Sequence, residues 1–590
     1  MRLKKAGLVR RFIIGFFAVM GAIFVLLIVI GAGIGFWFGR EPSVHVADNT
    51  VLTLDLTGAL PDQPSPQGLS QLLFPSGMSL ADTLGALTKA GDDPRVKGLV
   101  ARIGEGGMGF AEIQELRDAI AAFRAKGKRA VAYADTFGEL SSGTRSYYLA
   151  SAFDEIWLQP LGEVGLVGLR AELPYFRGTL DKLGIVADFE HREEYKDAAN
   201  PLTETAMTPA EREELQALLQ SIYGQIVDGI AKDRKLDPGT VKGLVDRAPL
   251  LIDEAMKAHL IDHVGYREDA LASFGAGTSR LSLARYFDAV GAPDRSGPTI
   301  ALIYATGLMA SGGGDNSLIG NSVMGADAVT RAFRMARDDK SVRAILFRID
   351  SPGGSAIAAE TIWKAVERTR AAGKPVIVSM GDVAGSGGYY IAAPANKIVA
   401  EPATLTGSIG VVAGKLAFGG LLKKLGGNSD SVQIGANAGM FSLMQDFTPS
   451  ERERLTAVLD NIYATFKDRV AEGRKLDASG VEAVAKGRVW SGEDAKARGL
   501  VDALGGFRTA LALAKQAAGI AEGENVTLKL YPPPKSAFDQ LMARVSDSAF
   551  SGADSLLPGR LSDALRTSLQ QAALALAPRG ALIMPPFVLR

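Results

Sequence analysis

Residues 373–402, GKPVIVSMGDVAGSGGYYIAAPANKIVAEP, place an apolar strand pattern before a glycine-rich turn and a second apolar run after it. Just upstream, AILFRIDSPGGS at 344–355 has the same order of an apolar run and a turn with paired glycines. Apolar residues at helical spacing over 358–368 lie between the two. Short apolar strands that alternate with amphipathic helices predict an α/β fold with a mostly parallel sheet.

The pattern occurs twice in the chain, which indicates a tandem duplication. Three segments of the first copy match three of the second: GLVARIGEGGMG (98–109) matches 344–355, GKRAVAYADTFGELSSGTRSYYLASAFDEIWLQP (127–160) matches 373–402, and TPAEREELQALLQSIYGQIVDGIAKDRKLD (208–237) matches TPSERERLTAVLDNIYATFKDRVAEGRKLD (448–477). Each copy is expected to begin with a strand, at 51–56 and at 299–304. The predicted boundaries are 50–272 for the first repeat, 273–297 for a connector, 298–515 for the second repeat and 516–590 for a C-terminal extension, in which 562–576 has helical spacing.

Composition argues against several classes of function. The 590 residues carry no net charge and no basic block, which argues against nucleic acid as a partner. Without a cysteine the chain has no disulfide, thiolate metal site or cysteine nucleophile. We expect neither a metal ion nor another cofactor. The histidines, His45, His191, His259 and His263, all precede the second copy, so a Ser–His pair within that copy is excluded.

An uncharged apolar run at 12–38 is longer than the ~20 residues that cross a bilayer as a helix. Basic residues are concentrated at 1–11, so the positive-inside rule places that end in the cytoplasm and the chain after Arg40 on the other side. The apolar region of a cleaved signal peptide, the alternative, is usually ~7–15 residues and ends at small residues. This run ends in GFWFGR, so we expect one uncleaved transmembrane helix in contact with membrane lipid.

The second copy contains a candidate nucleophile. Ser386 lies in GDVAGSGGYY, between a predicted strand at 375–380 and a helix-compatible run. A serine at such a turn is exposed for attack, and the helix N-terminus favours negative charge beside it. A purely structural Gly-Ser turn has the same sequence. The first copy has Thr144 here, followed by Arg145 and Ser146 instead of two glycines, so only the second copy keeps the motif.

The turn DSPGGS at 350–355 supplies paired glycines whose backbone N–H groups can point into a cleft. The N–H of Gly354, together with that of Gly387, would form an oxyanion hole for a tetrahedral intermediate. An ordinary βα turn uses the same residue types. The first copy reads GEGGM where the second reads DSPGG. The loss of this motif in the first copy favours a function for it in the second.

A serine nucleophile needs a base, and the second copy has no lysine between Lys424 and Lys467. The first copy has Lys196 in EYKDAANP, so each copy lacks what the other supplies, as expected if the two build one site. As a base, Lys196 needs a pKa lowered from ~10.4 toward ~7, which desolvation can produce. Alternation in FEHREEYK, 189–196, instead predicts an exposed row of charged residues.

A second hydroxyl follows the next predicted strand of the second copy. Ser408 lies in TGSIG, 406–410, and its counterpart in the first copy is Leu166. Its hydroxyl would hydrogen-bond the lysine amine, orient it and help to move its proton. A local turn stabilised by the serine side chain is the alternative.

These motifs together resemble the signal peptide peptidase A family, also called protease IV, in its long tandem-repeat form. DSPGGS, SGGYY, TGSIG and the upstream YK occur in the family's order, and the resemblance extends from the apolar run to about residue 515. It implies a β-spiral fold in each repeat, like that of caseinolytic protease and the crotonases, and a bowl-shaped homotetramer that faces the membrane. It also implies a Ser/Lys dyad, with Ser386 as nucleophile, Lys196 as general base, Ser408 coordinating the lysine, and Gly354 and Gly387 as oxyanion donors.

We therefore expect a serine endopeptidase anchored in a bacterial inner membrane, which degrades remnant signal peptides and other short apolar peptides on the periplasmic side. A crotonase-like acyl-thioester enzyme would share the fold and the oxyanion hole but would not use Ser386. A catalytically inactive membrane scaffold is the second alternative, and the complementary Ser386 and Lys196 argue against it. Because sequential domains joined by a short connector usually pack together, we expect both residues of the dyad to come from one chain. One position departs from the family pattern, since Asn200 replaces an acidic residue before Pro201.

Overall fold

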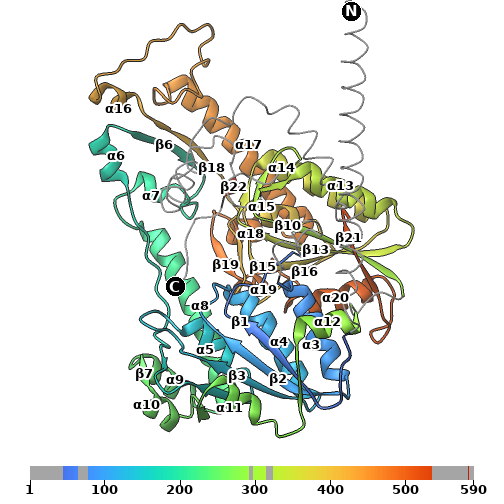
Figure 1. Ribbon diagram of the computed structural model, residues 1–590. Helices are drawn as coiled ribbons and strands as arrows, with labels where there is room; N and C mark the ends of the chain where they lie inside the picture. The colour runs from blue at the N-terminus through green and yellow to red at the C-terminus, as the bar shows by residue number, and fades with distance from the viewer. Residues whose placement is uncertain (1–43, 64–76, 292–296, 314–322, 534–581, 584–590) are drawn as a thin grey trace, which may run out of the picture.

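A computed structural model of the chain describes residues 44–63, 77–291, 297–313, 323–533 and 582–583 (Figure 1). The predicted transmembrane helix at 12–38 and the helical pattern at 562–576 lie outside these residues. Within the described ranges, no helix combines the length and the apolar character that a bilayer span requires.

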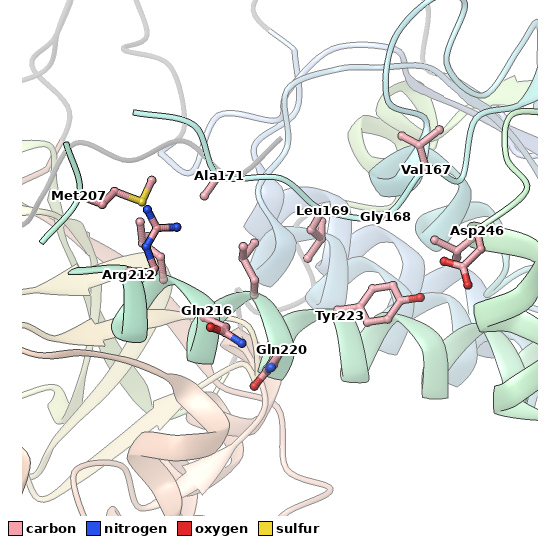
Figure 2. A pocket seen from close by; sticks show the side chains of 13 residues that line it. Val167, Gly168, Leu169, Ala171, Met207, Arg212, Gln216, Gln220, Tyr223 and Asp246 are labelled. Atoms are coloured by element: carbon pink, nitrogen blue, oxygen red, sulfur yellow. The ribbon is translucent and has the colours of Figure 1, made fainter. Parts of the chain in front are cut away.

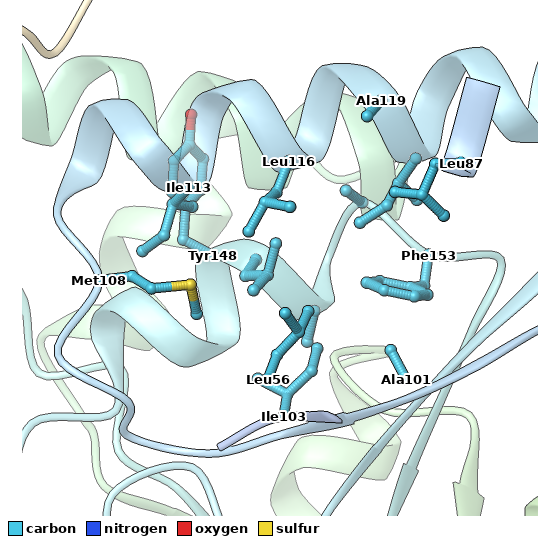
Figure 3. Close-up of a cluster of buried hydrophobic side chains, with 14 of the residues drawn as sticks. Leu56, Leu87, Ala101, Ile103, Met108, Ile113, Leu116, Ala119, Tyr148 and Phe153 are labelled. Carbon is cyan, nitrogen blue, oxygen red and sulfur yellow. The ribbon is translucent and has the colours of Figure 1, made fainter. Parts of the chain in front are cut away.

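The first repeat is built on a parallel sheet of six strands. Their order is β8 (His263–Val264), β4 (Glu155–Leu158), β3 (Arg129–Ala134), β2 (Val96–Ile103), β1 (Thr50–Leu56) and β9 (Ser279–Ser282). Helices α3 (Leu80–Asp92) and α4 (Phe110–Ala125) cover one face. Figure 3 shows Ile113 and Leu116 of α4 pointing toward Leu56 and Ile103 at the ends of two strands. Burial of these apolar side chains fixes the helices on the sheet.

The second repeat has the same plan with eight strands. The main path is β19 (Val489–Ser491), β17 (Leu405–Gly407), β15 (Val376–Gly385), β13 (Val342–Ser351), β10 (Thr299–Thr306) and β21 (Thr527–Tyr531), and β16 (Lys397–Ala400) and β20 (Ala503–Leu504) lie off it. Helices α13 (Ala326–Asp338), α14 (Ala356–Ala371) and α15 (Gly387–Ala392) pack near β13 and β15. The predicted α/β class with mostly parallel pairing is confirmed, and within this eight-stranded sheet only the short β19 runs antiparallel to its neighbour.

The predicted elements are present, but each repeat is longer than the sequence pattern indicated. The strands expected at 51–56 and 299–304 are β1 and β10, and the helix predicted at 358–368 falls inside α14. The residues assigned to a connector form β9, which pairs with β1, and helix α12 (Leu283–Val290). Strand β21, beyond residue 515, pairs with β10 in the same way. Strand β9 is short, and its residues are exposed or half-buried, so no alternation marked it.

The two repeats are joined in three ways. Strand β6 (Val186–His191) of the first repeat pairs antiparallel with β18 (Val412–Ala417) of the second. One cluster of buried apolar residues runs through both repeats, with Leu116 and Leu346 among its members. The buried guanidinium of Arg348 donates to Glu115 Oε1 at 2.6 Å across the junction. The repeats therefore form one continuous structure, and this junction positions the site.

Candidate active site

Ser386 lies at the turn between strand β15 and helix α15. It follows β15 directly and caps α15, with φ +54° and ψ −115°. A non-glycine residue with positive φ is strained, and such strain is typical of a nucleophile held at a strand-to-helix turn. Its backbone N–H donates to Gly407 O at 2.8 Å, and its O accepts from Tyr390 N–H at 2.9 Å. These bonds hold the strained turn, and the side chain is fully buried.

Lys196 reaches this serine from the other repeat. Strand β6 ends at His191, and the chain reverses at Glu193, which has φ +68°. Lys196 Nζ is then 2.9 Å from Ser386 Oγ, 2.9 Å from Ser408 Oγ and 3.1 Å from Ser408 O. The predicted exposed row of charged residues is wrong for Lys196, which is fully buried because the strand stops before it.

Ser408 is held where it can orient the lysine. It also has positive φ, +52°, and its N–H donates to Arg488 O at 2.7 Å. Gly487 lies against Lys196: a Cβ built there would be 2.5 Å from the lysine backbone N. Residues next to β19 hold Ser408, and Gly487 packs against Lys196. Lys196 Nζ therefore lies between Ser386 and Ser408.

Electrostatics favour a neutral lysine. Burial lowers the pKa of Lys196 to about 7, although the charges of Asp197 and Glu214 act in the opposite direction. Burial also raises the pKa of Asp197 to about 7, with the charge of Glu211 adding to the effect. For Glu214, burial followed by the charge of Asp197 raises the pKa well above its usual range. Because the effect of burial outweighs the attraction of these carboxyls for the ammonium form, Lys196 can release its proton near neutral pH.

Asp197 and Glu214 were not singled out from the sequence. Glu214 is buried on α8 (Pro209–Arg234) and accepts the Val489 N–H at 2.9 Å, which ties α8 to the strand behind Ser408. Its counterpart in the second copy is Arg454, so a charge difference between two otherwise similar helices was the only available signal. Asn200, which departs from the family pattern, donates to Glu211 Oε2 at 3.1 Å and is buried there.

The two predicted oxyanion glycines lie close together. Gly354 has φ +149° in β14 (Gly353–Gly354), a conformation that favours glycine. A Cβ added at Gly387 would lie 3.3 Å from Gly354 N, which shows how closely the two turns approach. In the first copy, Thr144 Oγ1 instead donates to Gly168 O at 3.0 Å. Only one complete constellation of serine, lysine and paired glycines is therefore present in the described residues.

Comparison with known proteins decides the family. The model of peptidase family S49 matches residues 122–278 and 368–521, one match in each repeat. The chain belongs to this family. It is therefore a serine endopeptidase, which confirms the resemblance drawn from the motifs and decides against the acyl-thioester alternative.

Two relatives show how far the similarity extends. Protease 4 of Salmonella typhi is 31% identical over 601 residues, which cover 95% of this chain and 94% of the relative. The chloroplastic serine protease SPPA of Arabidopsis thaliana is 31% identical over 554 residues, 90% of this chain and 78% of the relative. Among solved structures, a ClpP1 variant from Listeria monocytogenes is 15% identical and covers 36% of this chain and 94% of its own, with a TM-score of 0.23.

Proposed function

We propose that the family S49 endopeptidase reaction proceeds here through a Ser/Lys dyad formed by Ser386 and Lys196. The observation that supports it most directly is the 2.9 Å contact between Lys196 Nζ and Ser386 Oγ, with both side chains buried. A hydrogen bond of this length between a serine and a candidate base is the geometry of an activated nucleophile. The pKa of Lys196, lowered by burial to about 7, matches the requirement that a general base titrate near the working pH.

The proposed reaction has two halves. Neutral Lys196 takes the proton from Ser386 Oγ while the oxygen attacks the peptide carbonyl, and the negative charge moves to the carbonyl oxygen. The N–H groups of Gly354 and Gly387 stabilise that oxygen. Lys196 then gives the proton to the leaving amine, which departs and leaves an acyl-serine. Water, deprotonated by the same lysine, attacks the acyl-serine carbonyl. The bond to Ser386 Oγ then breaks, Oγ takes the proton back from Lys196, and the peptide leaves with a free carboxyl group. In both halves, a hydrogen bond with Ser408 keeps the Lys196 amine oriented toward Ser386 Oγ.

The strand edge beside the candidate oxyanion glycines suits a substrate with an extended backbone. The edge of β14 pairs antiparallel with the short strand β22 (Leu582–Ile583), so it accepts a peptide backbone beside the candidate oxyanion glycines. An added strand gives affinity through main-chain hydrogen bonds and little sequence restriction. We propose remnant signal peptides and other short apolar peptides as substrates, as the family resemblance implies.

The location and assembly of the protein belong to the same proposal. The apolar run at 12–38, with basic residues before it, supports a single-pass anchor in a bacterial inner membrane, with the catalytic repeats in the periplasm. The family resemblance supports a homotetramer. A protease-accessibility experiment on spheroplasts tests the topology: the repeats are expected to be digested from outside, and full protection would contradict it.

Replacement of the proposed nucleophile tests the activity. Ser386→Ala is expected to lower turnover of a fluorogenic leucine-containing peptide by at least ~10³-fold without a change in folding. Thr144→Ser, at the matched position of the first copy, is the control and is expected to leave turnover unchanged. Substantial turnover by Ser386→Ala would remove this residue from the mechanism.

A further inference from the structure

Helix α8 of the first repeat has two faces with different surroundings. One face borders an open groove (Figure 2), and its residues there include Arg212, Gln216, Gln220 and Tyr223. The other face is turned toward the second repeat, where Ser221 Oγ lies 2.9 Å from Ser491 Oγ of β19. Glu214 lies two helical turns before Ser221, so it is on this second face. Glu214 is only 1% exposed, which is rare for a glutamate and calls for a partner.

The partner of Glu214 is a strand of the second repeat. Its Oε2 accepts the backbone N–H of Val489, the first residue of β19, at 2.9 Å. Strand β19 lies at the edge of its sheet, so its outer side has no neighbouring strand to supply acceptors. Val489 also packs with Leu215 and Leu218 of α8 in a small buried apolar cluster. Helix α8 therefore holds this edge strand through one buried hydrogen bond and an apolar contact.

Strand β19 in turn fixes the backbone around both serines of the site. Val489 is paired with Gly407 in β17, and Gly407 O accepts the N–H of Ser386 at 2.8 Å. The carbonyl oxygen of Arg488, the residue before β19, accepts the N–H of Ser408 at 2.7 Å. A shift of β19 would therefore move the turn that carries the nucleophile and the hydroxyl that orients the lysine amine.

The duplication separates this contact from the general plan of the repeats. Arg454 has the place of Glu214 on α17 (Pro449–Arg474), and it is exposed there. Pro249 has the place of Val489 in the first repeat and has no N–H to donate. The acceptor on the helix and the donor on the strand are thus both kept only in the combination of repeats that builds the dyad. This selective retention favours a role in the reaction.

Glu214 needs no negative charge for this contact. Its Oε1 is buried and has no hydrogen-bond partner in the part of the chain that the structure describes, and an ionised carboxylate placed in this way would be costly. Burial, followed by the charge of Asp197, raises the pKa of Glu214 well above its usual range. The charges of Arg488 and Lys196 act in the opposite direction. The neutral acid still accepts the Val489 N–H through its carbonyl oxygen, so the contact depends on where the acceptor lies.

We propose that Glu214 is a positioning residue for the peptidase reaction: it holds β19 and thereby fixes the backbone that places Ser386 and Ser408 around the Lys196 amine. The first repeat then contributes a support for the nucleophile as well as the base. This role rests on the proposed Ser/Lys mechanism, because it acts on the geometry of the dyad. It requires an acceptor at the right place and no charge on it.

Two conservative substitutions separate the place of the acceptor from its charge. Glu214→Gln keeps an acceptor at the same reach without an ionisable group, and kcat is expected to stay within about threefold of wild type. Glu214→Asp keeps the acid but withdraws it by one carbon–carbon bond, about 1.5 Å. For this variant kcat is expected to fall about tenfold or more while KM stays within about twofold. Glu453→Asp, the same substitution at an exposed position of α17, is the matched control and should leave both constants unchanged.

The rate of labelling by a fluorophosphonate probe, measured per folded molecule, gives a second readout that does not depend on peptide binding. Glu214→Gln should be labelled at about the wild-type rate and Glu214→Asp about tenfold more slowly or less. An Asp variant with the wild-type rate, or a Gln variant as slow as the Asp variant, overturns the proposal. Ser386→Ala in the same peptide assay keeps the two proposals apart. If Ser386→Ala is inactive and Glu214→Asp is fully active, only the positioning role fails, whereas an active Ser386→Ala variant contradicts the proposed mechanism itself.

Discussion

Lys196 combines the proposed catalytic role with a cost to stability. Its amine is fully buried, and its pKa falls from 10.5 to about 7 through desolvation. Holding a lysine in a site that disfavours its charge costs on the order of 4 kcal/mol at pH 7, because the unfolded chain would be protonated there. The sequence pointed to this residue through reciprocal loss between the copies and through the family resemblance. It could not show the burial, which arises because the chain turns at Glu193 instead of continuing the strand.

Replacement of this lysine by an uncharged residue is therefore expected to stabilise the protein while it abolishes activity. Between pH 7 and about 10.5 the unfolded state holds more protons than the folded state, so wild-type stability rises with pH through this window. Lys196→Met lacks this pH-dependent cost, so its gain in thermal midpoint over wild type should be larger at pH 7 than at pH 9. Lys196→Arg, which keeps a charge that cannot be lost, should be inactive and less stable than wild type. Calorimetry at the two pH values checks this. A Met variant less stable than wild type at pH 7 would contradict the account.

At the scale of elements, the pairing of β6 with β18 brings Lys196 close to Ser386. The long helices α8 and α17 and most central strands were predictable, because capping residues and apolar spacing are local signals. The pairing of β6 with β18 was not predictable, because it joins segments that lie far apart in the sequence. Glycines allow the close approach of the two repeats at this junction. A Cβ at Gly414 would lie 2.4 Å from Asp188 O, and Gly487 lies against the backbone of Lys196.

Gly487→Ala is expected to displace Lys196 and to lower kcat/KM by roughly 10²-fold, because a misplaced base loses most of its effect. The positive φ of Gly487, +82°, adds strain to the steric conflict. Gly178→Ala on α6 (Arg177–Leu183) is the matched control, since an added Cβ there meets nothing within 4 Å. Activity is compared per folded molecule, with the folded fraction taken from thermal unfolding. Wild-type kcat/KM in the Gly487 variant would show that the lysine position does not limit the reaction.

At the scale of the whole molecule, buried contacts join the two repeats into one structure. Arg348 and Glu115, both buried, form an ion pair across the junction, and Asp382 accepts the N–H groups of Ala111 and Glu112 at the start of α4. The sequence established the duplication and the complementary losses. It could not reveal these cross-repeat contacts, because buried charged residues look like surface residues until a partner is placed beside them.

Because β6 carries Lys196 to Ser386 within one chain, variants that each lack one residue should not complement each other. Co-expression of Ser386→Ala with Lys196→Ala is expected to leave every mixed assembly inactive. Peptide turnover by the purified mixture is the measurement, with co-expressed wild type and Ser386→Ala as the positive control. Recovered activity would mean that the dyad crosses between chains.

The central claim is that Lys196 activates Ser386, and the rate of covalent labelling by a fluorophosphonate probe as a function of pH tests it most directly. In wild type the rate should rise with a midpoint near pH 7 as the lysine loses its proton, and mass spectrometry should locate the label on Ser386. Lys196→Ala should label at least ~100-fold more slowly across the same range, because the hydroxyl then has no base. A wild-type rate that does not change between pH 5 and 9, or labelling of the Lys196→Ala protein at the wild-type rate, would contradict the account.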